Sequence, residues 1–80
     1  MVLNDFVMYA NYAFKTEQKG LNCIDLGDGF VVRVEDRGDV ALTNNKSKER
    51  LFKSLDTVFK TLEKAGYKGV MRVGVNYEDD

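Results

Sequence analysis

The apolar residues at the start of the chain fit two different periods. Read with helical spacing, they form one stripe that consists of Leu3, Phe6, Val7, Ala10, Ala13 and Phe14. Alternate apolar positions between residues 6 and 14 fit a strand as well. We favour a helix over residues 3–19. Asn4 would cap its start, Asp5 would lie at its positive end, and Gly20 would end it.

The next residues carry the signal of a β-hairpin. Two runs rich in β-branched and apolar residues, 21–26 and 30–34, flank the loop Gly27-Asp28-Gly29. Glycine reaches the positive φ angles that such loops need, so we expect the two runs to pair antiparallel. A second turn at residues 36–39 and a short strand at 40–43 complete a predicted three-stranded meander.

The polar segment that follows has two interpretations. One begins a long helix near Ser47, and the other places a fourth strand at residues 49–53 and begins the helix at Ser54. We favour the second, because Ser54 is a good N-cap and Asp56 would lie in the first turn. In both, Gly66 ends the helix. The apolar face of this helix consists of Leu55, Val58, Phe59, Leu62 and Ala65.

Apolar and polar residues alternate from Met71 to Tyr77, which predicts a final, half-buried strand. The predicted class is α+β. We expect an antiparallel sheet of four to five strands with one or two helices packed on one face. No linker or internal repeat divides the chain, so residues 1–80 are expected to form a single small globular domain.

The composition excludes several kinds of chemistry. The 80 residues contain no histidine, so the usual general base at neutral pH and the imidazole metal ligand are both missing. The one cysteine, Cys23, cannot form an intramolecular disulfide, and no apolar run or leader addresses the chain to a membrane. We expect a cytoplasmic protein that is not an enzyme, with no catalytic residues, no cofactor, no metal and no small-molecule substrate.

The charges are distributed unevenly, although they sum to -1. Residues 46–72 carry a local balance of +5, while residues 1–45 and 73–80 carry -3 each. A basic face of this kind can meet phosphates, which makes nucleic-acid binding the alternative function. Its candidate residues are Lys53, Lys60, Lys64, Lys68 and Arg72.

Residues 50–67 resemble a strand-then-helix unit found in small accessory proteins of plasmids, phages and other mobile elements. The shared features are a phenylalanine (Phe52), the Ser-Leu-Asp sequence shortly after it (residues 54–56), an apolar helix face and a closing glycine (Gly66). The resemblance implies a context on a mobile genetic element. It implies no activity, and it assigns no functional residue to this chain.

Protein–protein interaction is the leading hypothesis. Met8, Tyr9 and Tyr12 fall outside the apolar stripe of the first predicted helix, and methionine and tyrosine are common in contact surfaces. Acidic side chains in the predicted turns would meet a basic partner. The candidate partner-binding residues are Tyr9, Tyr12, Asp28, Glu35, Asp36 and Asp39. We expect an inhibitor or adaptor that binds another protein, or a homodimer.

Overall fold

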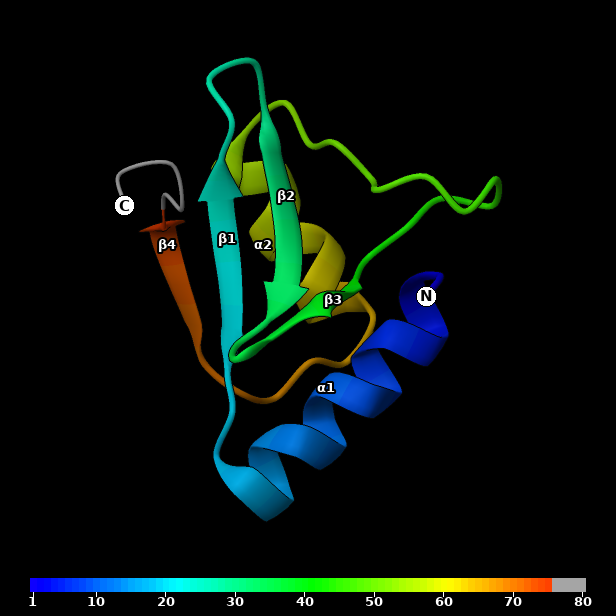
Figure 1. Cartoon of the computed structure of the whole chain (residues 1–80), viewed down its shortest axis with the longest axis vertical. Coiled ribbons are helices and arrows are strands. Elements are labelled where there is room, and N and C mark those ends of the chain that lie inside the picture. The colour runs from blue at the N-terminus through cyan, green and yellow to red at the C-terminus, as the bar shows by residue number, and fades with distance from the viewer. Residues whose placement is uncertain (76–80) are drawn as a thin grey trace.

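The computed structural model describes residues 1–75, apart from the side chains of residues 38, 39 and 75. The elements follow the order α1 (Leu3–Glu17), β1 (Leu21–Asp25), β2 (Phe30–Val34), β3 (Arg37–Ala41), α2 (Leu55–Lys64) and β4 (Met71–Val75). Figure 1 shows α2 behind β1 and β2, and α1 near the end of the sheet at which β1 begins. Tyr77, the predicted end of the last strand, lies outside the described residues.

The strands of the described region form one mixed sheet in the order β3-β2-β1-β4. β1 pairs antiparallel with β2, and β2 with β3, as the meander predicts. β4 pairs parallel with β1, so the prediction of a purely antiparallel sheet is wrong. The cause is a crossover: the chain leaves β3, forms α2 and returns to the end at which β1 begins. The α+β class itself is confirmed.

The first helix is confirmed as α1 and begins at Leu3 as predicted, but its N-cap and its C-terminal end differ from the prediction. Val2 is the N-cap in place of Asn4, because the carbonyl of Val2 already accepts the first helical hydrogen bond. At the other end Gln18 adopts a left-handed φ of 57°, which stops the helix before Gly20. Gly20 is buried where β1 begins, close against the start of β4.

The turn between β2 and β3 is shorter than predicted. Val34 pairs with Arg37, so the chain reverses over Glu35 and Asp36 alone. Asp36 adopts a φ of 60°, a left-handed conformation that aspartate tolerates better than most residues. The predicted turn at residues 36–39 is therefore wrong, because β3 already begins inside it.

The predicted strand at residues 49–53 is also wrong. The segment changes its pairing partner along its length, so no continuous ladder of hydrogen bonds forms. It makes two isolated antiparallel bridges, Thr43 to Glu49 and Phe30 to Phe52. A long helix from Ser47 does not form either, since α2 begins only at Leu55.

Both ends of α2 agree with the sequence. Ser54 caps the first turn, where its hydroxyl accepts a hydrogen bond from the Thr57 N–H at 3.3 Å. Gly66 adopts a φ of 92° just after the last turn. The Tyr67 N–H then folds back onto the Leu62 carbonyl at 3.0 Å, which completes a Schellman motif.

Both helices bury their apolar stripes in one core. Alternate residues of β1 and β2 join it from the face of the sheet that α2 covers. The buried cluster consists of Phe6, Val7, Ala10, Ala13, Leu21, Cys23, Val32, Val34, Leu42, Phe52, Val58 and Leu62. Phe59, predicted to be in the core, is 49% exposed because the buried stripe of α2 is narrower than its apolar face. Neither of these helices has the length and apolar character that crossing a membrane requires.

Candidate functional site

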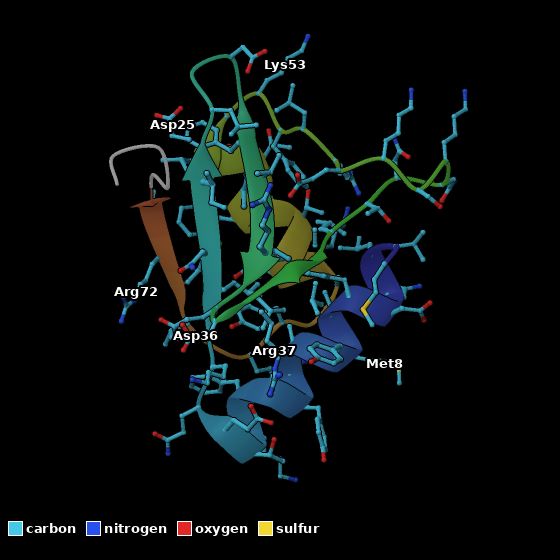
Figure 2. All side chains as sticks on the ribbon, viewed as in Figure 1. Met8, Asp25, Asp36, Arg37, Lys53 and Arg72 are labelled. Carbon is cyan, nitrogen blue, oxygen red and sulfur yellow. The ribbon has the colours of Figure 1, made fainter. Side chains whose placement is uncertain are left out.

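The outer face of α1 presents two large apolar side chains to solvent. Met8 is 72% exposed and Tyr12 is 65% exposed, and they lie one helical turn apart. Figure 2 shows Met8 pointing away from the body of the protein. Tyr9, the other predicted contact residue on this helix, is partly buried and packs against the core. Tyr9 therefore forms the edge of this surface, and Met8 and Tyr12 form its centre.

Polar contacts fix α1 against the rest of the fold. The Asn11 side chain donates to the Gly66 carbonyl at 3.1 Å and accepts from the Lys68 N–H at 2.8 Å. Near the C-terminal end of the helix, Glu17 forms an ion pair with Arg37 of β3. Figure 2 shows Arg37 lying over the helix. The exposed face of α1 is thus held in a defined position.

The two acidic residues of the β2–β3 turn are engaged within the protein. Glu35 accepts a hydrogen bond from the Gly20 N–H at 3.2 Å and forms an ion pair with Arg72 at 3.2 Å. Asp36 pairs with Lys19 at 2.7 Å. This hydrogen bond and the charge of its partner lower the pKa of Asp36 and raise the pKa of Lys19. The turn is therefore a mixed-charge cluster.

The remaining acidic candidates do not extend this cluster. Asp28 is exposed in the loop between β1 and β2, at the opposite end of the sheet from Asp36. Asp25 marks this distant end in Figure 2. The side chain of Asp39 lies outside the described part of the chain. The structure thus brings Glu35 and Asp36 together and places Asp28 elsewhere.

The candidates for nucleic-acid binding are spread over two elements, α2 and β4, and the connections on either side of α2. Lys60 lies on α2, where it pairs with Asp56 at 3.0 Å. Arg72 lies on β4, and its partner is Glu35. Lys53, Lys64 and Lys68 are exposed at separate places before, within and after α2. Of these five residues, Lys60 and Lys64 share α2, and the other three lie on different segments.

A second group of cations gathers in the connection between β3 and α2. We call residues 43–53 the basic arm; its cations are Lys46, Lys48, Arg50 and Lys53. The Glu49 carboxylate accepts two hydrogen bonds from Arg33 of β2, at 2.8 and 2.9 Å. Sequence reasoning counted these cations in the +5 segment but selected only Lys53. The signal for the rest is four cations within eight residues.

The described residues offer little that resembles a catalytic site. Cys23 is completely buried, and burial together with the charge of Asp25 raises the pKa of its thiol. Among the side chains that the structure describes, no three acidic or cysteine residues lie close enough together to hold a metal ion. A shallow groove of about 260 Å³ runs between α2 and the start of β4. It is lined by Phe59, Leu62, Glu63, Tyr67, Gly69 and Met71.

Comparisons with protein-family models, with curated proteins and with solved structures find no match to this chain. The resemblance of residues 50–67 to accessory proteins of mobile elements therefore stays a prediction. The function has to be inferred from the outer face of α1, the mixed-charge turn and the basic arm.

Proposed function

We propose that the protein is a non-enzymatic binding module that holds another protein through the outer face of α1. One observation carries the proposal: Met8 and Tyr12, 72% and 65% exposed, stand together on a helix whose opposite face is buried. Clustered exposed apolar side chains are typical of contact surfaces, and methionine and tyrosine are enriched in the centres of interfaces. Tyr9 would contribute at the margin of the contact.

The neighbouring charges define the chemistry of the partner. Asp5 and Lys15 are both exposed, and each lies three residues from the apolar pair, one at either end. A groove with an apolar floor, and with a cation at one end and an anion at the other, would complement this face. Because Asn11 and the core already fix the helix, binding would cost little additional ordering.

The mixed-charge turn is tied to a residue that follows the C-terminal end of α1. Lys19, the partner of Asp36, follows α1 almost directly, so a protein bound to the helix would meet the β2–β3 turn next. We place Asp36 at the margin of the contact, and Asp28 at the far end of the sheet outside it. A module of this kind would act as an inhibitor or adaptor by occupying a groove of its partner. The identity of the genes that lie next to the gene for this protein would test the expected mobile-element context.

Photo-crosslinking tests the proposed surface in the cells that naturally produce the protein. A photoreactive phenylalanine analogue replaces Tyr12 in one version and Leu26 in the matched control. Leu26 is 47% exposed and lies in the β1–β2 loop, at the other end of the sheet. We expect a discrete adduct from position 12 alone, and its loss when Met8→Ser is added.

Two results would contradict the proposal. The first is the absence of any adduct from position 12, and the second is the same adduct from both positions. The mass of the adduct shows whether the crosslinked partner is a different protein or a second copy of the chain. Sedimentation of the purified protein then shows whether it self-associates without any other component.

A further inference from the structure

The basic arm presents positive charge that no described acidic side chain neutralises. Its only carboxylate, Glu49, is turned toward the sheet by the bidentate pair with Arg33. None of the ion pairs among the described side chains involves the cations of the arm. Four cations therefore stand on one connection without an acidic partner in the described part of the chain. This surface is separate from the outer face of α1.

Backbone and side-chain contacts fix the shape of the arm. The Asn44 carboxamide oxygen accepts hydrogen bonds from the N–H groups of Lys46 and Lys48, at 2.8 and 3.2 Å. The Arg50 N–H donates to the carbonyl of Leu42 at 2.9 Å, and Leu42 is completely buried. Since the arm is anchored at its base and held at its tip, its backbone would lose little freedom on binding an anion.

The chemistry of the arm favours contacts with phosphates over contacts with bases. Its one aromatic residue, Phe52, is 3% exposed, and the Arg50 guanidinium covers its ring at 4.8 Å. Proteins that bind single strands need exposed aromatic rings on which bases stack, and the arm has none to offer. Contacts between lysine or arginine and the phosphates of a duplex need no aromatic ring and carry no sequence information.

We propose that the basic arm binds the phosphate backbone of a nucleic-acid duplex without reading its sequence. The contacts would come from Lys46, Lys48, Arg50 and Lys53. The ion pair with Arg33 holds the Glu49 carboxylate away from the phosphates that it would repel. The inference goes beyond the proposed protein contact and is independent of it. A protein that holds its partner through α1 could in this way also localise that partner on DNA or RNA.

Fluorescence anisotropy with a short labelled DNA duplex tests the arm. Four phosphate contacts predict an affinity that falls on the order of a hundredfold between 50 and 200 mM salt. The variant Lys46→Gln/Lys48→Gln should lower the affinity and reduce the slope of log K against log salt by about half. The matched control, Lys60→Gln/Lys64→Gln, removes the same charge from α2 and should leave both unchanged. All four side chains are exposed, so circular dichroism should show the same fold in both variants.

Several results would overturn the proposal. They are the absence of duplex binding at low salt, an equal effect of the two double variants, and equally tight binding of single strands. Equal competition by polyglutamate would reassign the arm to acidic proteins. Parallel titrations with duplex DNA and duplex RNA show which of the two duplexes the arm binds more tightly. Met8→Ser should not change any of these titrations, which keeps this test separate from that of the α1 surface.

Discussion

Glu35 and Arg72 form an ion pair across the sheet, with 3.2 Å between Arg72 Nε and Glu35 Oε2. The sequence predicts that Glu35 contacts a protein partner and that Arg72 contacts a nucleic acid. The parallel pairing of β4 with β1 brings them together, because it places Arg72 beside Asn22 near the end of the sheet that carries the β2–β3 turn. Part of the charge separation along the chain is thus cancelled within the folded protein.

The first prediction concerns the two roles of the Glu35 carboxylate. Glu35→Ala should destabilise the protein by about 1–3 kcal/mol, because the buried Gly20 N–H loses its acceptor. Glu35→Gln keeps an acceptor and loses only the pair with Arg72, whose side chain is 75% exposed, so it should cost less than about 1 kcal/mol. Urea unfolding measures both. High salt should reduce the cost of both variants by the same small amount, because both lose the ion pair with Arg72. Equal costs for the two variants would contradict this division.

Local signals in the sequence predicted local structure well. Ser54 and Gly66 mark the ends of α2, since capping depends on groups only a few residues away. The helical period of the first segment placed Met8 and Tyr12 off the buried stripe, and both are exposed. The most informative part of the candidate protein-binding surface was therefore visible in the sequence.

Relationships between distant residues were not visible. Alternation in the last strand predicts its two faces but not its direction, which is set by the crossover through α2. Phe59 continues the apolar face of α2, yet only the docking of the helix decides which edge of that face stays in solvent. In the same way, the run of cations around Glu49 gives no sign that Arg33 binds this carboxylate.

The second prediction concerns Asn11, which links α1 to the connection before β4. Asn11→Ala removes the bonds to the Gly66 carbonyl and the Lys68 N–H and should cost about 1–2 kcal/mol. Asn11→Asp keeps the acceptor for Lys68 and should fall between this variant and the wild type. Urea unfolding gives the ranking, and faster hydrogen exchange at Lys68 should accompany Asn11→Ala. An unchanged exchange rate there would show that the side chain does not hold the connection.

The third prediction is a loss of stability at high pH through Tyr67. Burial, with a smaller effect from Glu35, raises the pKa of Tyr67 to about 12, from an ordinary value of about 10. The folded state therefore favours the neutral phenol, which donates to the Val70 carbonyl at 2.7 Å. This stabilisation is complete below about pH 10 and is lost as the pH rises toward 12.

Tyr67→Phe isolates this effect. The variant lacks the hydrogen bond and should be less stable than the wild type by about 0.5–1.5 kcal/mol at neutral pH. Because its side chain does not ionise, the difference in urea stability should shrink between about pH 10 and 12. The tyrosinate absorbance of the wild type minus that of the variant should titrate near pH 12. A difference in absorbance that titrates near pH 10 would show that burial does not raise the pKa of the Tyr67 phenol.

The fourth prediction uses Cys23 as a reporter of opening. Its side chain is completely buried between the helices and the sheet, and burial raises the pKa of the thiol, so both access and ionisation oppose its reaction. A thiol reagent should therefore modify the native protein at least on the order of a thousandfold more slowly than the protein in denaturing urea, since only the rare open molecules react. In Asn11→Ala the logarithm of the reaction rate should rise in proportion to the loss of stability, because the rate follows the population of open molecules. Met8→Ser, on the exposed face of α1, should not accelerate the reaction. A native thiol that reacts as fast as the unfolded one would contradict the position of β1 at the centre of this core.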